Sequence, residues 1–248
     1  VIACEKTPLE IVSMEVKDTQ DSFKTGAALA KSLDKPNLRG IFVLSDGLSI
    51  NGSELAKGLN ILSKPEVSIT GGLAGDGSAF KKTWVICNGK TLSEHIVAVG
   101  FYGDHIKLTH SSGGGWDIFG PERLVTRATN NILYELDGRP ALTLYKEYLG
   151  DKASGLPATG LLFPLSIRKD DNDPNPLVRT ILAVDEATQS LTFAGDIPQG
   201  YRAQLMRANF DRLIGGASEA GKMAATHAES GPQLLVAISC IGRRLLLG

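Results

Sequence analysis

Arg39-Gly40-Ile41-Phe42-Val43-Leu44-Ser45-Asp46-Gly47 is a continuous apolar run that ends in turn residues. A run of this length and composition is typical of a buried strand. Apolar residues recur at helical spacing on both sides of it, at residues 23–33 and 55–62, and strand-like runs lie at residues 10–16 and 67–70. The alternation of strands and helices favours parallel strands joined by crossover connections, so we expect a βαβαβ unit.

The rhythm changes after Gly77, where β-rich runs at residues 83–87, 95–101 and 105–110 are separated by turn sequences such as Asn88-Gly89. Short runs with such turns favour antiparallel pairing. The second half mixes strands with helices. The strands are expected at residues 123–128, 132–136, 161–167, 178–184, 191–193, 202–207 and 233–239, the last buried, and the helices at 140–149 and 210–228. The predicted class is mixed α/β, with a parallel start, antiparallel additions and a second mixed half.

The most flexible stretch is Ser111-Ser112-Gly113-Gly114-Gly115, and it is the best position for a boundary between two regions. We therefore expect one region at residues 1–112 and another at 113–248. The sequence starts at Val1 instead of methionine and stops at Gly248 inside an apolar motif. These ends predict that the first region is incomplete at its start and the second at its end.

The composition argues against several classes of partner. Lys plus Arg total 26 against 27 for Asp plus Glu, a formal net charge of -1, so no global field attracts nucleic acid or an anionic membrane. The longest apolar runs are far below the roughly 20 residues that cross a bilayer. Cys4, Cys87 and Cys240 are far apart and lack the spacing of a zinc site, which favours free thiols, a cytoplasmic location and no metal.

An ordered series of motifs runs through most of the chain, and it resembles the FIST family of bacterial signal-transduction domains, in both its N-terminal and C-terminal regions. The resemblance covers residues 10–244. The motifs are Thr70-Gly71-Gly72-Leu73-Ala74-Gly75-Asp76-Gly77, Val125-Thr126-Arg127-Ala128, residues 132–141, Tyr145 with Leu149-Gly150, Phe163-Pro164-Leu165, Gly195-Asp196-Ile197-Pro198 and Ser239-Cys240-Ile241-Gly242-Arg243-Arg244.

The resemblance implies a sensory module that binds a small ligand, with an amino acid or a similar carboxylate metabolite as the expected class. It also implies a signalling output protein, such as a kinase, a cyclase or a chemotaxis component, which would act in trans. A subset of the family is reported to bind haem and sense nitric oxide. No histidine of this sequence stands in a motif for an axial ligand, so we expect no cofactor. The alternatives are a haem-based nitric oxide sensor and a Cys-dependent enzyme.

The glycine-rich loop at residues 71–77 follows a strand, and its glycines let backbone N–H groups approach a ligand. Gly71, Gly72, Gly75 and Asp76 are therefore candidate ligand contacts. A nucleotide phosphate fits poorly, because Ser78 stands where a P-loop requires lysine. A tight turn with no ligand is the alternative interpretation.

The motif at residues 239–244 places a thiol and two guanidinium groups at the expected end of a buried strand. Arginine can hold a carboxylate in a bidentate manner, so Ser239, Cys240, Arg243 and Arg244 are candidate ligand contacts. The alternative is a buried cysteine and an arginine paired to an acid. We expect this motif and the glycine-rich loop to line one pocket.

Three further features have both a functional and a structural interpretation. Asp46 ends a buried strand, where ligands often bind in parallel sheets, although Asp-Gly is also a turn signal. His227 precedes Cys240 by 13 positions and is the base that a Cys-dependent enzyme would need, but helix-end histidines are common, so we expect no catalytic residues. The acidic tract at residues 169–176 is expected to be solvated surface.

Overall fold

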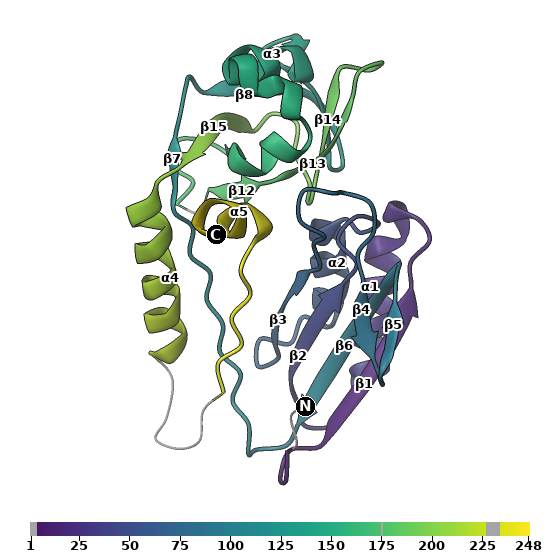
Figure 1. The fold of residues 1–248 in the computed structure, drawn as a ribbon. Coiled ribbons are helices and arrows are strands. Elements are labelled where there is room, and N and C mark those ends of the chain that lie inside the picture. The colour runs from purple at the N-terminus through teal and green to yellow at the C-terminus, as the bar shows by residue number, and fades with distance from the viewer. Residues whose placement is uncertain (1–3, 175, 227–233) are drawn as a thin grey trace. The chain divides into compact units, whose positions relative to one another are not determined.

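The structure is a computed structural model that describes residues 4–174, 176–226 and 234–248. These residues form two compact units, shown in Figure 1. The first takes in the described parts of Val1–Asp76, Lys81–Gly113 and Ala217–Ile238. The second takes in those of Gly77–Phe80, Gly114–Gly216 and Ser239–Gly248.

The elements follow one another with short connections. Those up to residue 102 are β1 (Leu9–Glu15), α1 (Ser22–Leu33), β2 (Leu38–Ser45), α2 (Gly52–Leu59), β3 (Ser68–Leu73), β4 (Val85–Cys87), β5 (Lys90–Leu92) and β6 (His95–Tyr102). Those after it are β7 (Trp116–Ile118), β8 (Arg123–Thr129), β9 (Ile132–Leu136), β10 (Arg139–Pro140), α3 (Ala141–Leu149), β11 (Leu165–Arg168), β12 (Leu177–Arg179), β13 (Ile181–Asp185), β14 (Ser190–Phe193), β15 (Arg202–Ala208), α4 (Phe210–Ala225) and α5 (Ile241–Leu247). Four short 3-10 helices lie at Thr19–Asp21, Asn60–Leu62, Gly150–Gly155 and Ala158–Leu162.

The first unit is built on a four-stranded mixed sheet with the order β1-β6-β2-β3. The βαβαβ start is confirmed, and β2 pairs with β3 in parallel. The last strand, β6, lies between β1 and β2 and pairs antiparallel with both. The apolar run that begins at Arg39 is thus a central strand with a neighbour on each side, which explains its near-continuous apolar composition.

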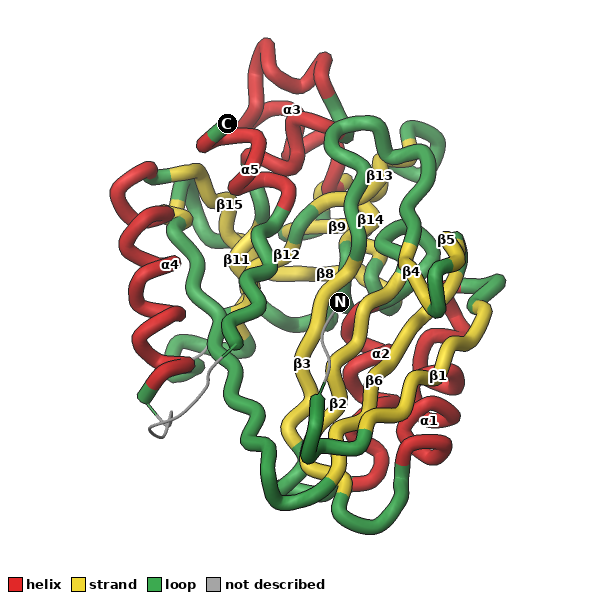
Figure 2. Tube along the Cα trace, turned by 60° about the horizontal axis from the view of Figure 1, so that its bottom comes forward, coloured by secondary structure: helices red, strands yellow, loops and turns green. Residues whose placement is uncertain are grey.

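The two faces of this sheet are covered by different elements. Helices α1 and α2 lie side by side on one face (Figures 1 and 2), and Ile96 and Ala98 of β6 are fully buried on that side. Val97 points to the opposite face, since side chains alternate along a strand. There it packs against Val85 and Cys87 of the β4–β5 hairpin. The strand β6 is therefore sandwiched between two apolar layers.

The second unit is a large antiparallel assembly with the strand order β12-β11-β15-β8-β9-β14-β13, to which β7 adds beside β15 and β10 beside β9. Its main core is continuous and includes the buried face of α3 together with Leu133, Leu191 and Phe193. The Tyr145 hydroxyl of α3 donates a 2.6 Å hydrogen bond to the Phe163 carbonyl oxygen, which joins two of the motifs quoted above. The mixed α/β class predicted from the sequence is confirmed.

Two predicted strands are absent, and both predictions are wrong for the same physical reason. Residues 105–110 and 234–239 have apolar or alternating composition, but the structure describes neither as a strand. Composition favours an extended backbone, whereas a strand also needs a neighbouring edge that accepts its hydrogen bonds. In the second segment Leu235 is 74% exposed, so the expected burial fails as well. Residue 233 and the end of the predicted helix after residue 226 lie outside the described residues.

No helix in the described part of the chain is long and apolar enough to span a bilayer.

Candidate functional site

Asp46 follows β2 directly and is buried, with 3% of its surface exposed. Its Oδ1 accepts backbone N–H groups of Leu48 at 2.9 Å and Ser49 at 2.8 Å. Its Oδ2 accepts the Thr83 hydroxyl at 2.6 Å and the Glu94 N–H at 3.3 Å. Both carboxylate oxygens are therefore used within the first unit, and this arrangement ties the end of β2 to the segments that precede β4 and β6.

The ionisation of Asp46 reflects two opposed effects. Burial raises the pKa of Asp46, because it disfavours the charged form. Hydrogen bonds from Thr83 and from three backbone N–H groups outweigh burial and hold the pKa below its ordinary value of 3.8. Asp46 is thus an ionised organiser of the strand end, a role that fits the turn signal recognised in the sequence.

The glycine-rich loop starts inside a strand, because β3 continues through Gly71 and Gly72. A Cβ atom on Gly71 would lie 1.8 Å from the Val43 carbonyl oxygen, so only glycine fits beside β2 at this position. Farther along, Asp76 Oδ2 accepts the backbone N–H groups of Lys81 and Lys82, at 2.7 and 3.0 Å. The close strand approach and this closed turn account for Gly71 and Asp76 without a ligand.

The motif at residues 239–244 is placed differently from its prediction. Ser239 and Cys240 are exposed, and Cys240 caps α5, where its Sγ accepts the Arg243 backbone N–H at 3.4 Å. The expected buried strand before the motif is therefore replaced by an exposed extended segment, and the two arginines lie on a short helix. His227 lies outside the described residues. Because the glycine-rich loop and this motif belong to different units, their shared pocket stays a prediction.

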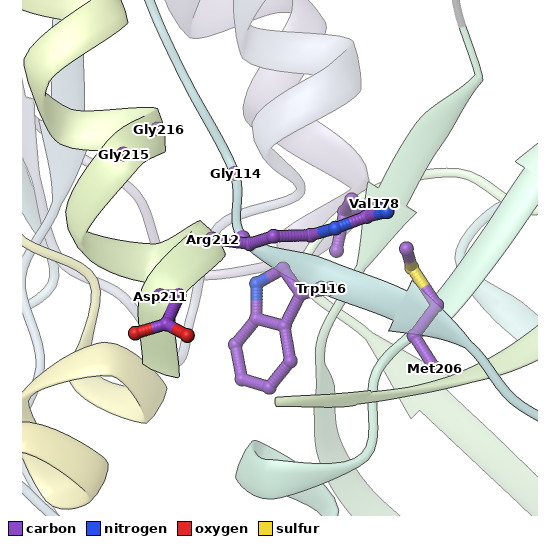
Figure 3. Close-up of a pocket in the computed structure, with 9 residues that line it drawn as sticks. Gly114, Trp116, Val178, Met206, Asp211, Arg212, Gly215 and Gly216 are labelled. Atoms are coloured by element: carbon purple, nitrogen blue, oxygen red, sulfur yellow. The ribbon is translucent and has the colours of Figure 1, made fainter. Parts of the chain in front are cut away.

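A hollow of about 500 Å³ lies in the second unit, and Figure 3 shows the residues around it. Segments of β7, β12, β15 and the first two turns of α4 surround it. The lining residues are Gly114, Gly115, Trp116, Val178, Met206, Asp211, Arg212, Gly215 and Gly216. Its volume suits a small organic molecule.

Close backbone contacts hold α4 against the wall of this hollow. A Cβ atom on Gly115 would lie 2.2 Å from the Leu213 nitrogen, and one on Gly216 would lie 2.0 Å from the Gly114 carbonyl oxygen. Leu213 is buried beneath the helix. The glycines that the sequence offers as a flexible seam therefore serve here as a tight packing surface for a helix.

A polar network fixes the start of α4. Asn209 precedes the helix and donates from Nδ2 to Asp117 Oδ2 at 2.8 Å. Arg212 Nη1 lies 2.8 Å from the other oxygen of Asp117. Asp117 thereby joins β7 to α4 and orients the Arg212 side chain along the hollow, as Figure 3 shows.

The motif at residues 239–244 reaches this hollow through Gly242. A Cβ atom there would lie 2.4 Å from the Leu161 carbonyl oxygen and 3.5 Å from Cη2 of Trp116. The start of α5 therefore packs against the tryptophan that lines the hollow. This contact connects one predicted site motif to a cavity that the sequence did not indicate.

The comparisons with known proteins agree with the motifs. Family descriptions of the FIST N domain and the FIST C domain match residues 1–139 and 141–248. The chain belongs to the FIST family. The hollow draws on both FIST regions, since Trp116 comes from the N region, whereas α4 and Gly242 come from the C region.

Another FIST-chain comparison concerns a curated relative. The chain is 28% identical over 163 residues to an uncharacterized protein of Methanocaldococcus jannaschii. The match covers 60% of this chain and 31% of that relative. No solved structure matches the chain.

Sequence reasoning missed Thr83, Trp116, Asp211 and Arg212. Thr83 carries no signal in the sequence, because its partner Asp46 is 37 positions away. Trp116 had a usable signal, since a large aromatic residue directly follows three glycines. The described residues contain no group of three His, Cys, Asp or Glu side chains that could hold a metal ion.

Proposed function

We propose that this FIST chain is a sensory module that binds a small ligand in the hollow beside Trp116. Membership of the FIST family supports a sensory role, because the resemblance implies small-ligand sensing for signal transduction. The observation that carries the assignment to this place is the composition of the lining. An apolar floor with a few polar groups at its edge is the usual architecture of a small-molecule site.

The floor consists of Trp116, Met206 and Val178, and the polar groups come from Asp211 and Arg212. Among the described residues, neither the indole N–H of Trp116 nor the Asp211 carboxylate has a hydrogen-bond partner. A ligand can therefore bind to one donor and one acceptor without breaking a contact of the protein.

The expected ligand is an amino acid or a similar carboxylate metabolite, and Arg243 and Arg244 are the candidate groups for its carboxylate. Both belong to the segment that starts α5 next to Trp116. Arginine presents two parallel N–H groups to a carboxylate, which suits such a ligand. The proposal includes the cytoplasm as the location and an output protein such as a kinase, a cyclase or a chemotaxis component, which reads the liganded state in trans.

The proposal has no catalytic step. Cys240 is an exposed thiol at a helix start, and its described contact is the backbone N–H of Arg243. A Cys-dependent enzyme needs a base beside its thiol. No described observation favours that alternative or the haem-based one over a binding role.

Native mass spectrometry of the purified chain tests the proposed function, together with thermal unfolding in the presence of each amino acid. We expect one small molecule to co-purify or to stabilise the fold. A ligand at about 100 times its dissociation constant contributes about 2.7 kcal/mol. Trp116→Ala should abolish the effect, and Arg243→Ala or Arg244→Ala should reduce it while the unliganded melting temperature stays nearly unchanged.

The matched control is Trp84→Ala, which removes the other tryptophan, an exposed residue of the first unit. The proposal is wrong if no metabolite co-purifies and no amino acid stabilises the wild-type chain. It is wrong in its location if a ligand binds equally well to the Trp116→Ala and Trp84→Ala variants.

A further inference from the structure

The charges around the hollow are unbalanced. Arg212 is the cation of the lining, and its guanidinium forms an ion pair with Asp117 at 2.8 Å. Asp117 also accepts the Asn209 amide, so Arg212 and Asp117 together form a neutral, structurally engaged pair. Asp211 adds one negative charge, and no ion pair to it occurs among the described residues. The lining therefore has a net charge of about −1 at neutral pH.

The apolar part of the lining suits a cation as well. Trp116 presents an indole ring, the aromatic side chain that attracts cations most strongly, and Figure 3 shows it in the middle of the lining residues. In this view Arg212 extends along one edge of the ring and the Asp211 carboxylate lies at another. Met206 and Val178 complete an apolar wall that can contact a hydrocarbon body.

We propose that the hollow selects ligands with a protonated amine on an apolar body, and that Asp211 accepts the ammonium group while the body packs on Trp116. This inference rests on the proposed function and specifies the chemistry of its site. A charge-assisted hydrogen bond from the ammonium to Asp211 is stronger than a neutral one. The cation gains further from the indole face, because partial exclusion of water strengthens that attraction.

An anion without an amine is disfavoured at this position. It would face the carboxylate of Asp211, and Arg212 could bind it only by giving up its ion pair with Asp117. A neutral ligand would leave Asp211 without a partner and lose the charge-assisted bond. An amino acid remains compatible, since its ammonium group can reach Asp211.

Three probes that share one phenyl ring separate these possibilities. Phenethylamine is positively charged at neutral pH, 2-phenylethanol is neutral, and 3-phenylpropanoate is negatively charged. The measurement uses the full chain with Trp84→Phe, in which Trp116 is the remaining tryptophan, and follows its fluorescence during titration. We expect phenethylamine to bind more tightly than the alcohol by about tenfold or more, and 3-phenylpropanoate to bind most weakly.

Asp211→Asn removes the charge with little change of shape, and it should weaken phenethylamine binding about tenfold or more while the alcohol binds as before. Glu147→Gln is the matched control, because Glu147 is an exposed acid of the same unit that does not line the hollow. Added salt should weaken the binding of the amine and leave the alcohol unaffected.

The inference is overturned if 3-phenylpropanoate or 2-phenylethanol binds as tightly as phenethylamine, or if Asp211→Asn and Glu147→Gln bind the amine equally well. The proposed function survives those results when a metabolite still co-purifies with the wild-type chain. If no probe binds and no metabolite co-purifies, both the inference and the proposed function are wrong.

Discussion

The hydroxyl of Thr83 donates a 2.6 Å hydrogen bond to the carboxylate of Asp46, and both side chains are buried. Thr83 Oγ1 also accepts the Gly47 backbone N–H at 2.9 Å. One hydroxyl therefore satisfies a buried anion and a buried backbone donor. A buried polar group that loses its partner costs about 1–3 kcal/mol, so this pair has a measurable effect on the stability of the fold.

Thr83→Val should lower the free energy of unfolding by about 1–3 kcal/mol, because it keeps the shape and removes both hydrogen bonds. Urea unfolding followed by circular dichroism measures the change. Thr91→Val on β5 is the control, since Thr91 is exposed, and it should stay within about 0.5 kcal/mol of the wild type. Equal effects of the two variants would contradict the structural role of Thr83.

The pKa of Asp46 predicts how stability depends on pH. In the folded state this pKa lies below the ordinary value of 3.8, so the folded chain binds the proton more weakly than the unfolded chain. The resulting stability is fully present above the unfolded pKa and is lost as the pH falls through the folded pKa. Asp46→Asn should therefore destabilise the fold most at neutral pH, and its deficit should shrink toward low pH. A deficit that grows on acidification would contradict this sign.

Helices α1 and α2 depend on a close contact between two glycines. A Cβ atom on Gly58 would lie 2.2 Å from the Phe23 carbonyl oxygen and 2.8 Å from the Ala27 nitrogen. Gly58→Ala should therefore destabilise the chain by about 1–3 kcal/mol, because the backbones must move apart. Gly221→Ala on α4 is the control, since nothing lies within 4 Å of its Cβ position, and it should stabilise by up to about 1 kcal/mol. Thermal unfolding that ranks the two variants in the opposite order would refute the contact.

The three cysteines should react with thiol reagents at different rates. Cys240 is exposed, Cys4 is half-buried and Cys87 is buried against Val97 in the first unit. We expect a fast phase from Cys240 that Cys240→Ser removes, and a slow phase from Cys87. Unfolded protein without reductant should show three free thiols. A count of one would indicate a disulfide and contradict the free-thiol prediction.

Most elements of the fold were predictable because their signals are local. The run from Arg39 to Gly47 is a strand, and Asn51 caps the following helix through Oδ1, which accepts the Ser53 and Glu54 N–H groups. Turn residues and hydrophobic spacing act over a few positions, so one sequence is enough to identify them. The insertion of β6 between β1 and β2 was not predictable, since strand order depends on contacts between distant segments.

The candidate site shows the same division. The resemblance to the FIST family follows from ordered motifs, and it directed attention to Gly71–Gly77 and to Cys240. The hollow is formed by residues near 115, 178, 206 and 212, which are far apart along the chain. No local pattern links Trp116 to Asp211, so sequence reasoning missed both.

The sequence by itself determined the mixed α/β class, the positions of most helices and strands, and the family. Only the tertiary structure decided that Asp46 is held by Thr83, that residues 234–239 are exposed, and that Trp116 and Asp211 line one hollow. Backbone propensity and hydrophobic periodicity are properties of neighbouring residues. Hydrogen-bond partners and cavities, by contrast, depend on which distant segments pack together, and this information is not written in any short stretch of the chain.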